Sequence, residues 1–183
     1  NDEALASVLK AIQISPRFGE AFLNKGNILA KLKKNTEAIA AYEDALRLNA
    51  ALFFAYSGLG NVYFDLNRCD EAFFAYGKAL SIKPDLDVAW LGRGNVYAEL
   101  KHYSEALAAY DKTLSITPDL ADAWLGRGNV LFSLKQDANA LASYSKALEL
   151  KPDLANGHFN VSLVKLSLGE YEEGWKLYEW RWK

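Results

Sequence analysis

The same short segment returns at a fixed interval of 34 residues along this chain. Three copies begin at Tyr56, Trp90 and Trp124, and they read Tyr-Ser-Gly-Leu-Gly-Asn-Val-Tyr, Trp-Leu-Gly-Arg-Gly-Asn-Val-Tyr and Trp-Leu-Gly-Arg-Gly-Asn-Val-Leu. A looser copy begins at Phe22. A fixed period in this range indicates a fold built by stacking one small unit, so function is to be sought on surfaces rather than in one buried pocket.

A second set of residues recurs in register with that segment. It consists of Ala38, Ala72, Ala106 and Ala140, then Tyr42, Tyr76, Tyr110 and Tyr144, with Pro84, Pro118 and Pro152 closing three units. The first segment carries a central glycine, at Gly26, Gly60, Gly94 and Gly128. Glycine inside a helix costs about 1 kcal/mol, so we expect it where two helices approach closely. The pattern predicts two helices in each unit.

In this register the residues resemble the tetratricopeptide repeat family, whose unit is a pair of helices of this length. The resemblance implies an all-α, right-handed superhelical solenoid of antiparallel helix pairs with a concave surface that faces a ligand. We expect one solenoid domain over residues 1–183. Its parts are a partial repeat at 1–18 with a second helix only, full repeats at 19–52, 53–86, 87–120 and 121–154, and an incomplete repeat at 155–183. Because the chain opens inside a helix pattern and contains no methionine, we expect a piece of a longer protein.

The turns between paired helices in this family often need a left-handed residue, which glycine supplies most easily. Here only the last turn has one, at Gly169, and the equivalent positions hold Lys33, Asn67, Lys101 and Lys135. Candidate N-caps for the second helices are Asn35, Asp70 and Ser104.

Charge and composition disfavour several classes of partner. The net charge is −2 and there is no basic block, so we expect neither nucleic acid nor a membrane surface as a partner. No apolar run approaches the ~18 residues of a membrane span. The single cysteine, Cys69, cannot form an internal disulfide, which favours a reducing, cytoplasmic location.

Catalytic and metal-binding constellations are not recognisable in the sequence, so we expect no catalytic residue, no metal, no cofactor and no enzyme activity. His102 falls in a polar turn. His158 takes the position of Trp90 and Trp124, and it is interpreted as a packing residue rather than a ligand or base. Cys69 takes the place of Tyr103 and is interpreted as a small buried side chain.

One position on the exposed face of each first helix holds asparagine, namely Asn27, Asn61, Asn95 and Asn129. An amide both donates and accepts, so a row of four suits a peptide backbone whatever its side chains. The alternative is that asparagine here is a common structural residue that caps neighbouring turns. Both interpretations remain open at this point.

Around this row, the same face offers Leu23, Ser57, Leu91 and Leu125, and one turn further on Phe64, Asp65, Glu99 and Phe132. Family members that clamp a terminal carboxylate carry lysine where Leu23 and its equivalents stand, so such a clamp is not expected. The surface favours an apolar or amphipathic peptide, with a basic residue to meet Asp65 or Glu99.

The C-terminal segment departs from the repeat and concentrates aromatic residues, namely Trp175, Tyr178, Trp180 and Trp182. At α-helical spacing Trp175, Tyr178 and Trp182 share one side, which suggests docking of a further domain or self-association. The segment resembles the ends of bacterial repeat proteins in which a glycosyltransferase-like domain follows.

Three functions are compatible with these features of the sequence. The first is a non-catalytic protein–protein interaction scaffold that holds a peptide or helix in its concave groove. A second is a substrate-recruiting arm of a larger enzyme such as a bacterial glycosyltransferase. A third is a self-assembly module, in which the open helix near Leu5 and Leu9 meets the aromatic end of another copy to form a homo-oligomer.

Overall fold

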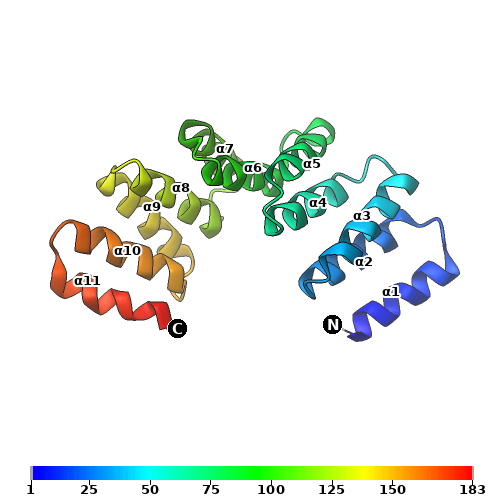
Figure 1. Ribbon diagram of the computed structural model, residues 1–183, viewed down its shortest axis with the longest axis horizontal. Coiled ribbons are helices and arrows are strands. Elements are labelled where there is room, and N and C mark those ends of the chain that lie inside the picture. The colour runs from blue at the N-terminus through cyan, green and yellow to red at the C-terminus, as the bar shows by residue number, and fades with distance from the viewer. Residues whose placement is uncertain (1, 183) are drawn as a thin grey trace. The chain divides into compact units, whose positions relative to one another are not determined.

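The computed structural model describes residues 2–182, which form eleven α-helices and a closing 3-10 turn, without a strand (Figure 1). The helices are α1 Asp2–Ile14, α2 Gly19–Lys31, α3 Asn35–Leu48, α4 Phe53–Asp65, α5 Cys69–Ile82, α6 Asp87–Glu99, α7 Tyr103–Ile116, α8 Ala121–Ser133, α9 Asp137–Leu150, α10 Ala155–Ser167 and α11 Tyr171–Tyr178, followed by η1 Glu179–Trp182. The predicted all-α helical-repeat class is confirmed.

The chain divides into two compact units, Asn1–Val96 and Tyr97–Lys183, with the division inside α6. In the first unit α2 pairs with α3 and α4 with α5, α1 packs on α2, and α3 packs on α4. In the second unit α8 pairs with α9 and α10 with α11, while α7 packs on α8 and α9 on α10. The first helices of successive repeats also touch, α2 with α4 and α8 with α10, so they form one side of each unit. Among residues 2–182 no helix is long and apolar enough to cross a lipid bilayer.

In each full repeat, a tyrosine from the second helix fills the space that glycines leave in the first helices. A Cβ atom added at Gly26 would lie 2.6 Å from the Tyr42 ring, and one added at Gly58, in the next repeat, 2.5 Å from it. Tyr76 covers Gly60 and Gly92 in the same way, and in the second unit Tyr110 covers Gly126 and Tyr144 covers Gly128. These rings are buried, as are the alanines beside them. At Gly26, Gly60 and Gly128, where we expected close approach of two helices, the group that needs the space is a tyrosine ring.

The turns between paired helices take the left-handed conformation in all five described cases. Lys33, Asn67, Lys101 and Lys135 have φ between 57° and 59°, and Gly169 has φ 82°. Three lysines therefore occupy a backbone conformation that costs a residue with a Cβ atom ~1–2 kcal/mol.

The prediction of N-caps is wrong for the second helices. The helix α5 begins at Cys69, so Asp70 lies inside its first turn. The residue at the N-cap position is Arg68, and its side chain makes no capping hydrogen bond. Asn35 and Ser104 likewise lie within α3 and α7. These helices are held by packing of their alanine and tyrosine face, which makes a side-chain cap dispensable.

Candidate functional site

A hollow of about 380 Å³ lies along the first helices of the first unit. It is lined by Leu23, Asn24, Asn27, Tyr42, Phe54, Ser57, Gly58, Asn61 and Val88. Leu23 and Asn27 lie one helical turn apart on α2, and Ser57 and Asn61 lie one turn apart on α4, so each pair shares a face. The structure thus brings together four of the residues that the sequence predicted for a binding surface. We call this hollow the α2–α4–α6 groove.

The lining of the groove combines apolar side chains with three asparagines and a serine, and none of the lining residues is charged. Phe54 is 52% exposed and Val88 is 38% exposed, which is high for such side chains. Ser57 is only 3% exposed, so it contributes to the floor and not to the contact surface that the sequence suggested. A groove without charged lining residues offers no counter-charge to a charged ligand.

Two of the three asparagines that line the groove, Asn27 and Asn61, are held by the buried tyrosines. The Tyr42 hydroxyl donates to Oδ1 of Asn27 at 2.9 Å, and the Tyr76 hydroxyl donates to Oδ1 of Asn61 at 2.7 Å. Both asparagines are exposed, and among residues 2–182 their Nδ2 groups have no hydrogen-bond partner. The amides therefore do not cap neighbouring turns. They face outward as donors, because the acceptor oxygen is already engaged.

Tyr42 is a groove residue that the repeat pattern places only in the core. Burial raises the pKa of its phenol to about 12, so the hydroxyl stays protonated and remains a donor at neutral pH. The signal that could have identified it is the constant spacing, since Tyr42, Tyr76 and Tyr144 each follow their asparagine by 15 residues.

Other predicted residues of the first unit lie outside the groove. Phe64 is half-buried and packs against the core cluster around Tyr76. Asp65 forms an exposed ion pair with Lys33, whose Nζ lies 2.7 Å from Oδ2. Leu91 and Asn95 are half-buried on α6, where Val88 forms the groove wall instead.

In the second unit the predicted residues are more strongly engaged within the protein. Asn129 Oδ1 accepts from the Tyr144 hydroxyl at 3.0 Å and from Asn160 Nδ2 at 2.8 Å, which links α8 to α9 and α10. Leu125 and Phe132 pack against the core cluster of Leu131, Ala140, Tyr144 and Val164. Glu99 is exposed at the end of α6.

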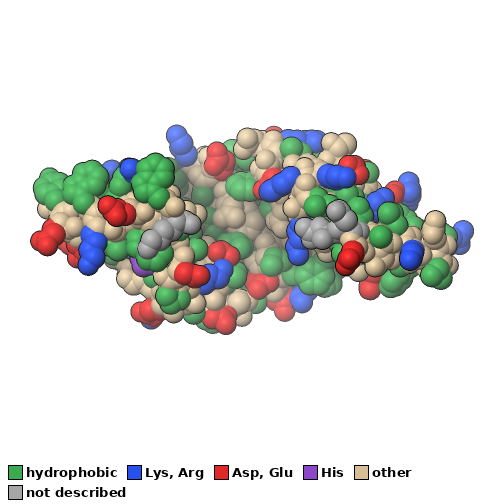
Figure 2. Space-filling view, turned by 90° about the horizontal axis from the view of Figure 1, so that it is seen from below, with side chains coloured by type: hydrophobic (Ala, Val, Ile, Leu, Met, Phe, Trp, Pro, Cys, Tyr) green, Lys and Arg blue, Asp and Glu red, His purple; other side chains and the backbone are tan. Residues whose placement is uncertain are grey.

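The C-terminal aromatic residues divide into a packed pair and an exposed pair. Trp180 stacks on His158 with ring centroids 4.0 Å apart, and Tyr178 lies 5.2 Å from Phe159. Trp175 and Trp182 are 58% and 78% exposed, and hydrophobic side chains gather over α11 in Figure 2. The change from α-helix to 3-10 turn after Tyr178 turns Trp180 back onto α10.

His158 is a packing residue, as predicted. Its Nε2 lies 2.8 Å from the backbone oxygen of Pro152. Trp90 and Trp124 donate from Nε1 to the oxygens of Pro84 and Pro118 at the same distance of 2.8 Å, so the imidazole takes the place of the indole. Among the described residues no group of three or more His, Cys, Asp or Glu side chains could hold a metal ion.

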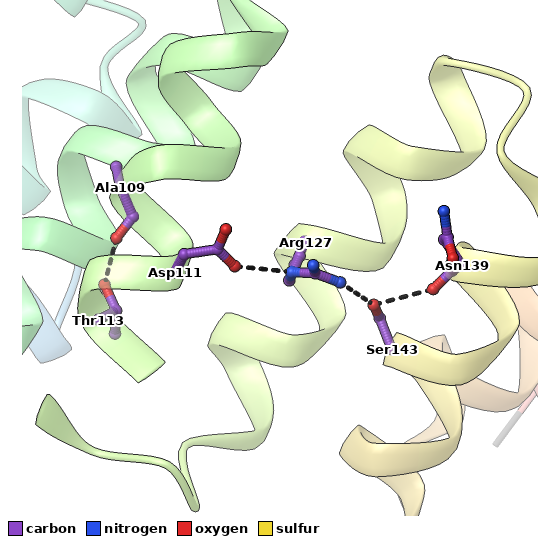
Figure 3. A network of polar contacts seen from close by, with 6 residues as sticks. All are labelled: Ala109, Asp111, Thr113, Arg127, Asn139 and Ser143. Carbon is purple, nitrogen blue, oxygen red and sulfur yellow. Dashed lines mark hydrogen bonds and ion pairs between the residues drawn. The ribbon is translucent and has the colours of Figure 1, made fainter. Parts of the chain in front are cut away.

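An arginine joins three helices of the second unit (Figure 3). Arg127 on α8 donates from Nε to Asp111 Oδ1 on α7 at 2.8 Å, and from Nη1 to Ser143 Oγ on α9 at 2.9 Å. Ser143 in turn donates to the backbone oxygen of Asn139 at 3.0 Å. The guanidinium is thus a structural tie between consecutive helices and makes no arrangement suited to catalysis.

Comparison with known proteins identifies the family. A family model described as TPR repeat matches residues 26–67, 60–101 and 94–135, and one described as tetratricopeptide repeat matches residues 121–154. Together they cover well over half of the chain. The chain belongs to the tetratricopeptide repeat family. No curated protein matches its sequence.

Solved structures share the fold of this tetratricopeptide repeat chain at low identity. YrrB, described as a TPR protein with an unusual peptide-binding site, is 22% identical with a TM-score of 0.71 over 97% of this chain and 91% of that one. Pseudomonas aeruginosa PilF is 19% identical with a TM-score of 0.80 over 88% of this chain and 74% of that one. A chain of the APC/C hetero-tetramer Cut9–Hcn1 is 21% identical with a TM-score of 0.91 over 98% of this chain and 36% of that one.

Proposed function

We propose that this protein is an interaction scaffold that binds an extended, uncharged and apolar peptide segment in the α2–α4–α6 groove. The observation that carries the proposal is the pair of outward-facing Nδ2 donors, Asn27 and Asn61, set among the apolar side chains of Leu23, Phe54 and Val88. These N–H donors have no partner within the described residues and lie beside apolar side chains. A ligand that supplies a hydrogen-bond acceptor there would satisfy them.

The donors favour an extended segment over a helix. An extended peptide offers backbone carbonyls along its length, whereas those of a helix are satisfied internally except at its end. Asn27 and Asn61 lie on successive repeats, so they reach carbonyls at two separate points of one segment. Phe54 and Val88 then contact its apolar side chains.

The neutral lining decides the chemistry of the ligand. The groove contains no lysine or arginine for a terminal carboxylate, and Asp65 is paired with Lys33. A charged ligand residue would lose water without gaining a counter-charge there, which is unfavourable. YrrB is described as having a peptide-binding site, which supports the class of ligand but not its sequence.

The test begins with peptides selected on the protein from a random displayed library, whose affinities are then measured by fluorescence anisotropy. We expect uncharged apolar sequences. The double variant Asn27→Asp with Asn61→Asp replaces each donor by an acceptor of the same shape and should weaken these peptides at least about 10-fold.

The matched control is Phe74→Ala, on the second helix α5 and outside the groove, which should leave peptide affinity unchanged. Unaltered binding to the double aspartate variant, or selection of charged peptides, would contradict the proposal. The enzyme-arm and end-to-end assembly alternatives remain predictions, and so do the resemblance of the C-terminal segment to glycosyltransferase-linked repeats and a cytoplasmic location.

A further inference from the structure

One stripe on the outer face of α5 departs from the repeat pattern. Asp70, Phe74 and Lys78 follow one another at steps of four residues, so they lie along a single face of the helix. The Phe74 side chain is 65% exposed. The equivalent positions in α3, α7 and α9 hold Ala40, Ala108 and Ala142. The helix pair does not need an aromatic ring at this place.

The Phe74 ring forms a ridge between two hollows of the first unit. The hollow toward α4 is about 320 Å³ and is lined by Tyr56, Leu59, Tyr63, Asp70, Glu71, Phe74 and Ala75. The hollow toward α6 is about 390 Å³ and is lined by Asp70, Phe73, Phe74, Gly77, Lys78, Ser81 and Arg93. Arg93 lies over the Phe73 ring at 4.2 Å, which fixes the floor of the second hollow. Each hollow is large enough to receive an aromatic side chain.

Packing within residues 2–182 does not require a glycine at Gly77, on the same face. A Cβ atom added there would meet nothing within 4 Å, in contrast to the glycines that the tyrosines cover. The sister helices carry Glu43, Asp111 and Ser145 at this position. Glycine at this position costs α5 about 1 kcal/mol of helix propensity. Because glycine has no side chain, a second helix can approach the backbone closely here.

The charges of the stripe are opposite at its two ends. Among residues 2–182 the Asp70 carboxylate has no hydrogen-bond or ion-pair partner, whereas its neighbour Glu71 is bound to Arg68 at 2.6 Å. The Lys78 ammonium lies 5.3 Å from the centre of the Phe74 ring. From its N-terminal end the stripe therefore presents an acid, an exposed aromatic ring and a base, one helical turn apart.

We propose that α5 is a self-association surface that pairs antiparallel with α5 of a second copy of this chain, about a two-fold axis at Phe74. In this arrangement Asp70 of each copy faces Lys78 of the other, because both lie four residues from the axis. Each Phe74 ring enters a hollow beside the ring of the other copy, and Gly77 lets the backbones approach. Such a surface is complementary to itself, as a two-fold interface requires. It lies outside the α2–α4–α6 groove, so the two proposals are independent.

The test is sedimentation equilibrium of the purified chain over a range up to about 1 mM, since an interface of one helix and its flanks is at the small end of specific interfaces. The chain should associate to a dimer. Phe74→Ala, which restores the residue of the sister helices and leaves the fold intact, should lower the association constant at least about 10-fold. A chain that stays monomeric over this range would overturn the proposal, as would a dimer indifferent to Phe74→Ala.

Charge variants test the register. Asp70→Lys alone sets lysine opposite lysine, and Lys78→Asp alone sets aspartate opposite aspartate, so each variant should be monomeric. An equimolar mixture of the two variants restores both opposite-charge pairs and should form a heterodimer. A mixture that remains monomeric while the unaltered chain dimerises would overturn the antiparallel pairing. Circular dichroism of each variant confirms that the helices are retained.

Discussion

At the scale of single residues, the lysines in the turns between paired helices have a strained, left-handed backbone. Lys101 has φ 59°, and within residues 2–182 its turn is held by backbone hydrogen bonds, such as that from its N–H to the oxygen of Ala98 at 3.0 Å. A left-handed lysine costs ~1–2 kcal/mol, and glycine in its place avoids this cost but is more disordered in the unfolded chain. The two effects oppose each other, and the removal of strain is the larger.

We therefore expect Lys101→Gly to raise the free energy of unfolding by about 0.5–1 kcal/mol. Urea denaturation followed by circular dichroism at the helical band measures the shift in the midpoint. The matched control is Gly169→Ala, at the equivalent turn with φ 82°, which should lower stability by a similar amount. A destabilised Lys101→Gly variant would show that the lysine side chain contributes a contact of its own.

At the scale of the elements, two glycines inside helices differ in what surrounds them, so replacing them by alanine should have opposite effects on stability. The ring of Tyr42 leaves no room for a Cβ atom at Gly58, whereas the surroundings of Gly77 are open. Gly58→Ala should therefore destabilise the fold by about 1–3 kcal/mol through overpacking against a rigid ring. Gly77→Ala should stabilise the fold by about 1 kcal/mol through helix propensity. Thermal unfolding of the two variants side by side checks the signs, and equal effects would contradict this account.

The periodic pattern is sufficient to predict the elements. Glycine, alanine and tyrosine recur because neighbouring helices need them for packing, so the helix pairs can be placed from their spacing alone. Caps are harder to place, since packing over a whole helix outweighs one hydrogen bond at its end, and Asp70 shows that a favourable residue type is no guarantee.

The groove could be predicted only in part, and for a physical reason. Helical spacing places Leu23, Asn27, Ser57 and Asn61 on one surface, and the structure brings them together. Spacing within one helix does not reveal what a side chain meets on the next. The tyrosine that fixes the acceptor of each amide, the burial of Phe64 and the pairing of Asp65 with Lys33 all depend on neighbouring helices.

At the scale of the whole molecule, a buried tyrosine in each full repeat links stability to pH. Burial raises the pKa of Tyr42 to about 12, and it raises those of Tyr76, Tyr110 and Tyr144 further. The unfolded chain loses these protons near pH 10 while the folded chain retains them. The contribution of these tyrosines to the free energy of unfolding is therefore fully present below about pH 10. Above that pH the free energy of unfolding falls, by about 1.4 kcal/mol per pH unit for each tyrosine.

Urea denaturation between pH 9 and about pH 12 measures this slope. Tyr42→Phe removes the hydroxyl that holds Asn27, which should cost about 1 kcal/mol at neutral pH. The same variant has one titrating group fewer, so its stability should fall less steeply above pH 10. A slope identical to that of the unaltered chain would exclude Tyr42 as a source of the pH dependence.

The shared contacts of the tyrosines also decide how this protein could be cut and rejoined. Tyr42 needs Gly26 from its own repeat and Gly58 from the next, and Tyr76 needs Gly60 and Gly92. A 34-residue unit excised at its turns would separate Tyr42 or Tyr76 from one of its two glycines. Two consecutive repeats are therefore the smallest piece of the first unit that keeps such a ring packed on both sides.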